Sequence, residues 1–128
     1  MIWSDPSILE VISNPTEEAY EVKIDCPELT FVGVKEQPDF AILHITYYPI
    51  DKVMELRSLK RYIFDFRNRV ISYERLINVV YEDLIKVYEP KRLRLVMECN
   101  PRGGISSVLT IDSDWAVRGG KEEFKDWL

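Results

Sequence analysis

The stretch FAILHITYYP, residues 40–49, alternates its side chains between two faces and ends at a proline. The sets on the two faces are Ala41, Leu43, Ile45 and Tyr47, and Ile42, His44, Thr46 and Tyr48. This period of two predicts a β-strand, and both of its faces are largely apolar. We therefore expect helices to cover one face and a partner subunit to cover the other.

Another alternating segment precedes this strand, and the period changes after Pro49. Residues 20–26 (YEVKIDC) alternate and predict another strand. Residues 51–68 place apolar side chains at helical spacing, with Asp51 as a candidate N-cap. A second helix is predicted from the capping candidate Ser72 to Pro90, and two more strands at residues 91–99 and 105–115.

The predicted order β-β-α-α-β-β indicates an α+β fold, with one antiparallel sheet and two helices on a single face. The chain has 128 residues, of which 46% are hydrophobic, so a single domain over residues 1–128 has enough apolar surface for a core. We expect residues 1–19 to be a helical or irregular lead-in and residues 117–128 to be a loosely held tail.

Composition narrows the class of protein. The net charge of −5 argues against a general nucleic-acid-coating protein. The two cysteines, Cys26 and Cys99, lack metal-ligand spacing and read as reduced thiols, which indicates a cytoplasmic protein. The single histidine, His44, leaves no histidine cluster for a metal, and we expect none. No apolar run approaches the ~18 residues of a membrane span, so we expect no membrane segment.

Six short segments occur in an order that resembles one protein family: LEVISNP, CPELT, QPDFA, ELRSLKRY, FRN followed by Glu74, and PRGGIS. Together they resemble the QueF family, the NADPH-dependent reductases of 7-cyano-7-deazaguanine (preQ0). The resemblance implies the tunnelling fold (T-fold), preQ0 as ligand and NADPH as cofactor. It also implies a role in 7-deazaguanine metabolism for tRNA modification, and a homo-oligomer, pentamer or decamer, with sites between subunits.

The resemblance assigns roles to three side chains of the substrate site. Asp39 of QPDFA matches the family's proton donor and acceptor. Glu74 matches the carboxylate that binds the guanine-like edge, and Tyr73 stands where a histidine usually precedes that glutamate. Without the resemblance, Asp39 reads as a turn residue and Glu74 as a first-turn glutamate favoured by the helix dipole.

The resemblance also implies a cofactor site. In ELRSLKRY the motif residues are Glu55, Ser58, Lys60 and Tyr62, with Arg57 in place of the usual lysine. Arginine keeps the positive charge but presents a planar fork. In PRGG, Arg102 adds a cation that suits a phosphate, next to Gly103 and Gly104, which allow a ligand to approach the backbone closely. The alternative is a solvated basic helix face.

The family's nucleophilic cysteine is missing. Where it stands before QPD, this chain has FVGVKE and is one residue shorter, which places Gly33 or Val32 at the nucleophile position. Cys26 is a poor substitute, because more residues separate it from Asp39 than separate the family's cysteine from its aspartate. These additional residues span roughly 20 Å when extended.

Three functions follow from this pattern. The first is an NADPH-dependent nitrile reductase giving the aminomethyl product (preQ1), whose turnover the missing thiol calls into question. The second is a QueF-like archaeosine synthase acting on preQ0 in tRNA, the one alternative with a tRNA partner. The third is a noncatalytic, purine-binding T-fold protein.

Overall fold

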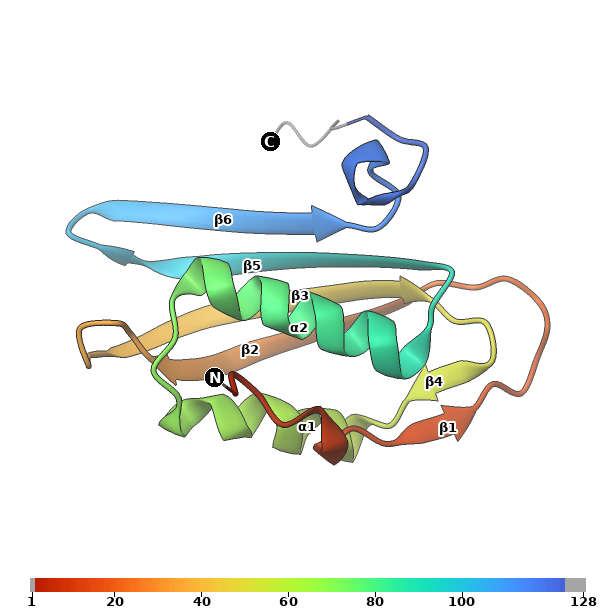
Figure 1. Cartoon of the computed structure of the whole chain (residues 1–128), viewed down its shortest axis with the longest axis horizontal. Helices are drawn as coiled ribbons and strands as arrows, with labels where there is room; N and C mark the ends of the chain where they lie inside the picture. The colour runs from red at the N-terminus through yellow and green to blue at the C-terminus, as the bar shows by residue number, and fades with distance from the viewer. Residues whose placement is uncertain (1, 124–128) are drawn as a thin grey trace.

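The computed structural model describes residues 2–123. β3 (Pro38–Tyr48) is an inner strand of a four-stranded antiparallel sheet in the order β2-β3-β5-β6. The other strands are β2 (Val22–Val32), β5 (Arg92–Arg102) and β6 (Ile105–Asp112). Helices α1 (Leu56–Asp65) and α2 (Tyr73–Tyr88) lie on the same face of this sheet (Figure 1). The predicted α+β architecture is therefore confirmed.

The alternation read from the sequence decides which side chains enter the core. The predicted inward residues of β3 and β5 are all buried: Ala41, Leu43, Ile45, Tyr47, Leu93, Leu95, Met97 and Cys99. The other face of β3, from Ile42 to Tyr48, is half-buried, and both described helices lie on the opposite face. That a partner subunit covers this face stays a prediction.

Helix α2 begins and ends as its sequence predicts. The Ser72 hydroxyl accepts a hydrogen bond from the Arg75 N–H (3.1 Å), which satisfies a free donor of the first turn. The inward stripe is Leu76, Ile77, Val80 and Leu84. Glu89 adopts a left-handed conformation (φ 45°) directly before Pro90, which cannot continue the helix. Within residues 2–123, no helix has the length and apolar character needed to cross a membrane.

The predicted start of the first helix at Asp51 is wrong. Lys52–Met54 form a short strand, β4, and α1 follows it with Glu55 as the N-cap. The Glu55 carboxylate accepts from the N–H groups of Arg57 (2.9 Å) and Ser58 (2.8 Å). The pattern misled because a strand partner, β1 (Val11–Ser13), is provided by the lead-in, where only helical or irregular structure was expected.

Two further boundaries differ from the sequence prediction. β2 continues past Cys26 to Val32, through a bulge between Cys26 and Leu29 that contains Pro27. Proline is tolerated in a strand at such an irregularity. In the predicted loose tail, the N–H of Ala116 bonds to the carbonyl of Glu122 (2.6 Å). Positions 124–128 of that tail lie outside the described residues.

Three buried tyrosines join separate segments of the chain through their hydroxyls, and two of them reach the region of the small β1–β4 sheet. Tyr88 donates to the carbonyl of Glu10 (2.8 Å), and the Tyr47 oxygen accepts from the N–H of Met54 (3.0 Å). Tyr62 donates to Asp83 Oδ2 (2.5 Å). Buried hydroxyls need such partners, and here they join the lead-in to α2, β4 to β3, and α1 to α2.

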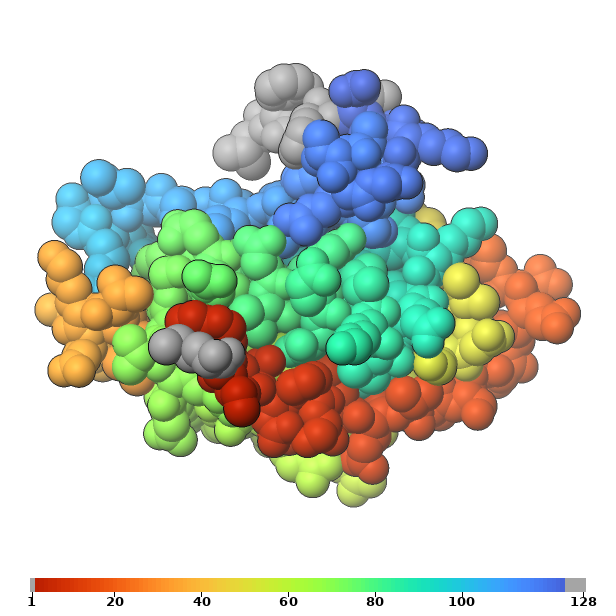
Figure 2. All heavy atoms as spheres, in the orientation of Figure 1, coloured from red at the N-terminus to blue at the C-terminus, as the bar shows by residue number. Residues whose placement is uncertain are grey.

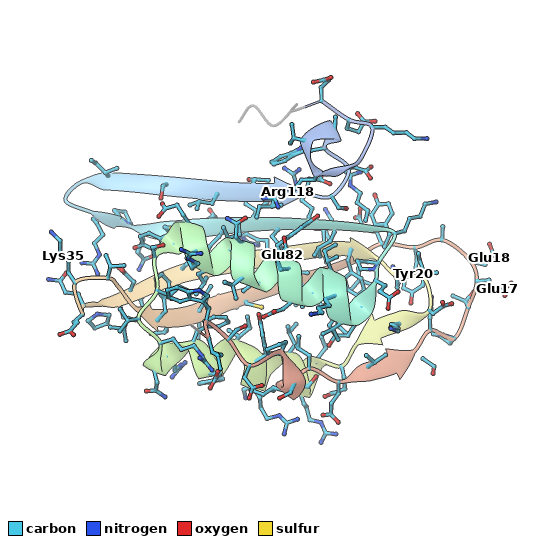
Figure 3. All side chains as sticks on the ribbon, viewed as in Figure 1. Glu17, Glu18, Tyr20, Lys35, Glu82 and Arg118 are labelled. Atoms are coloured by element: carbon cyan, nitrogen blue, oxygen red, sulfur yellow. The ribbon has the colours of Figure 1, made fainter. Side chains whose placement is uncertain are left out.

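The loop between β2 and β3 and the loop between β5 and β6 lie at the same end of the sheet (Figures 1 and 2). The first, residues 33–37, is closed by hydrogen bonds from Gly33 N to Gln37 O and from Glu36 N to Gly33 O, both 2.7 Å. Lys35 lies at its tip (Figure 3). In the second, Gly103 and Gly104 have positive φ angles, which glycine adopts without a steric cost. The substrate residues expected from the sequence gather at this end.

Candidate functional site

Asp39, Tyr73 and Arg102 meet although they come from three different elements. Asp39 stands at the start of β3 and is only 8% exposed. Its Oδ1 accepts a hydrogen bond from the Tyr73 hydroxyl (2.9 Å) at the start of α2. The same oxygen accepts from Arg102 Nε (2.7 Å) at the end of β5. The structure thus brings together three of the residues that the sequence singled out.

Arg102 also joins the two loops at this end of the molecule. Besides Asp39, its guanidinium donates to the side-chain oxygen of Gln37 and to the carbonyl of Pro38 (3.0 Å). A planar guanidinium with several N–H donors suits such a set of acceptors. The hydrogen bond that Arg102 donates to Asp39 raises the pKa of Arg102, so Arg102 is a charged guanidinium. That Arg102 also binds a phosphate stays a prediction, and in this arrangement its guanidinium is already bonded to three acceptors of the protein.

Tyr73 is a neutral donor in this cluster. Burial, and then the hydrogen bond to Asp39, raise the pKa of Tyr73 above its ordinary value of 10.0. Its ring packs edge-to-face on Phe31, with 5.2 Å between ring centroids. Phe31 pairs with Asp39 across β2 and β3, so the same strand pairing orients the ring and the carboxylate.

Glu74 follows Tyr73 and is exposed. Within residues 2–123 its carboxylate makes no hydrogen bond or ion pair, whereas its backbone carbonyl accepts from the Asn78 side chain (2.8 Å). An exposed carboxylate in the first turn of α2 is favoured by the helix dipole. It is also free to accept hydrogen bonds from a ligand.

Gly33 is the position that faces Asp39. A Cβ built on Gly33 would collide with Asp39 Oδ2 and approach the Gln37 carbonyl to 3.2 Å. Val32 precedes it on β2 and belongs to the other face, because successive side chains of a strand alternate. Of the two positions left open by the missing cysteine, Gly33 therefore has the geometry from which a side chain would reach Asp39.

Cys26 is far from this cluster. It pairs with Leu43, whereas Asp39 pairs with Phe31, five positions further along β2. At about 3.3 Å per residue, this separation is roughly 15 Å. Burial, with a contribution from Asp25, raises the pKa of Cys26 to about 11, which disfavours the thiolate. The structure does not bring Cys26 to the candidate site.

The other thiol, Cys99, was not assigned to the site by the sequence reasoning. It pairs with Ala41 across β3 and β5, and it is buried on the same face as Asp39. Burial is the main cause that raises its pKa, and the charges of Glu74 and Asp39 add to it. Its inward position on β5, three residues before Arg102, could have indicated from the sequence that Cys99 lies near the site. Cys99 is a protonated thiol near two carboxylates.

The expected cofactor residues of α1 divide into two groups. Ser58 is fully buried, accepting from the Glu10 N–H (2.9 Å) and donating to the Glu55 carbonyl (2.8 Å). Tyr62 is buried against Asp83, and burial raises its pKa far above the ordinary range. Neither hydroxyl is free to contact a cofactor in this arrangement. Glu55, which accepts from two N–H groups, has a lowered pKa and serves as the helix cap.

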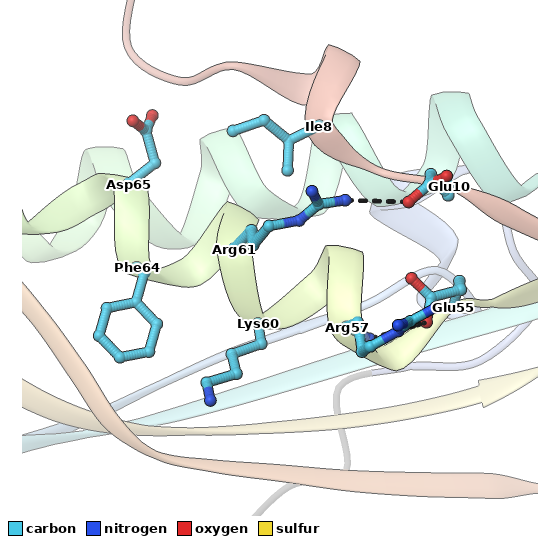
Figure 4. Close-up of a pocket in the computed structure, with 8 residues that line it drawn as sticks. All are labelled: Ile8, Glu10, Glu55, Arg57, Lys60, Arg61, Phe64 and Asp65. Atoms are coloured by element: carbon cyan, nitrogen blue, oxygen red, sulfur yellow. Dashed lines mark hydrogen bonds and ion pairs between the residues drawn. The ribbon is translucent and has the colours of Figure 1, made fainter.

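The cations of α1 line an open groove of about 720 Å³ (Figure 4). Its lining includes Arg57, Lys60, Arg61 and the ring of Phe64. Arg61 is paired with Glu10 (2.9 Å), while Arg57 has a highly exposed side chain that reaches Glu55 only at 3.8 Å. Arg57 and Lys60 are therefore the cations that fit an anionic ligand here. This groove contains neither Asp39 nor Glu74.

Comparison with known proteins points to one family. Residues 38–118 match the family model described as "QueF-like protein". NADPH-dependent 7-cyano-7-deazaguanine reductases are similar, among them one from Nitratiruptor that is 39% identical over 83% of this chain and 82% of its own length. The one from Parabacteroides distasonis is 42% identical over 79% of this chain, and the one from Bacillus cereus is 45% identical over 79%. The chain spans 66% and 62% of those two proteins.

A solved structure shares the fold. The apo form of an archaeosine synthase, QueF-Like, matches 72% of this chain and 91% of its own with a TM-score of 0.67 and 16% sequence identity. Both the resemblance to QueF and the tunnelling fold predicted from the sequence are confirmed.

Proposed function

Because the chain belongs to the QueF-like protein family, we propose that it binds a 7-deazaguanine at the site formed by Asp39, Tyr73 and Glu74. The observation that carries this proposal is the Asp39–Tyr73–Arg102 cluster beside the unpaired carboxylate of Glu74. The relatives are named for 7-cyano-7-deazaguanine, which makes purines of this kind the ligands to test.

Glu74 is the group that recognises the purine. A guanine-like edge presents the N1–H and the exocyclic amine side by side as donors, and a carboxylate has two oxygens that accept only. Hydrogen bonds to a charged acceptor are among the stronger ones in proteins. The ring of Tyr73, which packs edge-to-face on the buried Phe31, is the aromatic group next to this carboxylate.

Covalent catalysis is the step that this chain lacks. A thioimide forms when a thiol adds across the nitrile, so a sulfur must lie within bonding reach of the nitrile carbon. Gly33 supplies no side chain at the position facing Asp39. Cys26 is distant, and Cys99 is a buried thiol with a raised pKa. We therefore propose purine binding without a thioimide.

NADPH is the cofactor named for the relatives, and Arg57 and Lys60 are the residues of this chain that would hold its phosphate groups. NADPH supplies a hydride when it is bound. The buried positions of Ser58 and Tyr62 restrict this chain's contribution to the exposed cations and Phe64. In this proposal, the outer face of α1 contributes to cofactor binding mainly through the positive charges of Arg57 and Lys60.

Assembly completes the proposal. Asp39 and Glu74 lie at one end of the sheet, where several large apolar side chains are exposed: Val34, Phe40, Val70 and Ile105. β2 and β6 are the outer strands of the four-stranded sheet, and at the end of β2 Val32 bonds to the backbone of Arg69 and Ile71. The remaining length of an outer strand can pair with another chain. We propose a ring of subunits that pairs these edges. Light scattering should give an oligomer at micromolar concentration, and a stable monomer would contradict it.

Calorimetric titration with guanine tests the binding function. We expect a dissociation constant in the micromolar range, which corresponds to a binding free energy of about −8 kcal/mol. A few charge-assisted hydrogen bonds and one stacked purine would give an affinity of this order. Absence of heat for guanine, for 7-cyano-7-deazaguanine and for 7-aminomethyl-7-deazaguanine would refute the proposed function.

A further inference from the structure

We propose that Asp39 makes this site select 7-deazaguanines whose 7-substituent donates hydrogen bonds, such as an ammonium or an amidine, over those that carry a nitrile. This inference rests on the proposed function and concerns the group at the 7-position, not recognition of the purine edge. It follows from which atoms of Asp39 are occupied and which one is left.

Within the described residues, the hydrogen bonds to the side chain of Asp39 all go to Oδ1. Arg102 donates from Nε (2.7 Å) and its Nη2 forms an ion pair with the same oxygen (2.5 Å), and the Tyr73 hydroxyl adds a second hydrogen bond (2.9 Å). Arginine stays charged in proteins, so the group facing it is a carboxylate. A carboxylate accepts hydrogen bonds and donates none.

Oδ2 is the oxygen left for a ligand. No hydrogen bond to it occurs within the described residues, and it lies against Gly33, where a Cβ would collide with it. The glycine therefore permits this position of the carboxylate. A side chain at position 33 would have to displace Asp39 from Arg102.

A nitrile matches this oxygen poorly. The nitrile nitrogen is an acceptor, so a nitrile and a carboxylate repel each other, whereas an ammonium or amidine group donates to the carboxylate. Burial strengthens both effects, because the side chain of Asp39 is only 10% exposed.

The charges around the site favour a cation as well. Asp39 and Arg102 cancel, Tyr73 and Cys99 are protonated and neutral, and Glu74 adds one negative charge. Arg102 is held by Gln37 and Pro38 in addition to Asp39, so its guanidinium is fixed beside the carboxylate. The described groups that face the ligand therefore sum to a single negative charge.

The test is a calorimetric comparison of three ligands on the assembled protein: guanine, 7-cyano-7-deazaguanine and 7-aminomethyl-7-deazaguanine. We expect the aminomethyl compound to bind at least about tenfold more tightly than the nitrile. Asp39→Asn should remove this preference, so that the two 7-substituted compounds bind with similar affinities. Glu82→Gln, on the exposed face of α2 (Figure 3), serves as the control and should change neither the preference nor guanine binding.

The outcomes separate the two proposals. A nitrile that binds as tightly as the aminomethyl compound would overturn this inference while guanine binding still supports the proposed function. Failure of all three ligands would instead remove the proposed function itself. The comparison of ligands on the wild-type protein decides the inference even if Asp39→Asn does not fold.

Discussion

Gly33 and Asp39 occupy one shared space: the carboxylate of Asp39 fills the position that any side chain at residue 33 would enter. Glycine at position 33 does more than remove a nucleophile, because it also determines where the carboxylate of Asp39 lies. With glycine there, Asp39 lies in the ion pair with Arg102 and in the hydrogen bond with Tyr73. The glycine and the closed carboxylate cluster are therefore parts of one arrangement.

Gly33→Cys should recover covalent chemistry. The new thiol would lie next to Asp39 and displace its carboxylate, a displacement that only moves the end of a side chain. Incubation with 7-cyano-7-deazaguanine should then give an adduct with the summed mass of protein and ligand, because a thiol adds to a nitrile without a leaving group. Intact mass spectrometry under denaturing conditions measures it.

Val32→Cys is the matched control, since its side chain belongs to the other face of β2 and should give no adduct. An adduct on Val32→Cys but not on Gly33→Cys would show that the position facing Asp39 has been misassigned.

Glu74→Ala should weaken guanine binding by roughly 2–4 kcal/mol, because it removes two charge-assisted hydrogen bonds and leaves the ligand donors unpaired. Calorimetry measures the change. Glu82→Ala removes another exposed glutamate of α2 and should leave the affinity unchanged. Equal affinities of the wild type and Glu74→Ala would rule out the assigned role of Glu74.

His44 should titrate above its ordinary pKa of 6.5. Its Nδ1 contacts Asp25 (2.7 Å) and its Nε2 contacts Glu98 (2.6 Å), and the hydrogen bonds to these carboxylates, Asp25 first, raise the pKa. Both ring nitrogens can donate only when the imidazole is protonated. The other charged residues that line the same groove are Glu21, Lys23, Arg92 and Arg94.

Because the folded pKa of His44 is raised, its stabilising effect is complete below about pH 6.5 and is lost as the pH rises through the folded pKa. NMR titration of the single histidine measures that pKa directly. Asp25→Asn should bring it down towards 6.5. A wild-type pKa at or below 6.5 would contradict the geometry.

The sequence predicted those parts of the fold that depend on local periodicity. Alternation placed Leu43 and Ile45 in the core, and the cap and the proline marked both ends of α2. It failed at Asp51, because the pairing of β4 with β1 joins segments about forty residues apart and leaves no periodic signal in either. The bulge at Pro27 hid the second half of β2 for a similar reason.

For the candidate site, motifs identified Asp39, Tyr73, Glu74 and Arg102, and the structure brings Asp39, Tyr73 and Arg102 into contact. The motifs did not reveal which hydrogen bonds each of the predicted side chains makes. The hydrogen bonds of Ser58 and Tyr62 to other segments and the closure of Arg102 on Asp39 depend on tertiary contacts. The place of Cys99 followed from its strand, but no motif marked it.

Mass spectrometry of the wild-type protein with 7-cyano-7-deazaguanine, recorded under native and then under denaturing conditions, tests the central claim most directly. Binding at the Glu74 site without a thioimide predicts a complex in the native spectrum that disappears completely on denaturation, also in the presence of NADPH. Cys26→Ala and Cys99→Ala should give the same pair of spectra. Ligand mass that survives denaturation, or no complex in the native spectrum, would contradict the account.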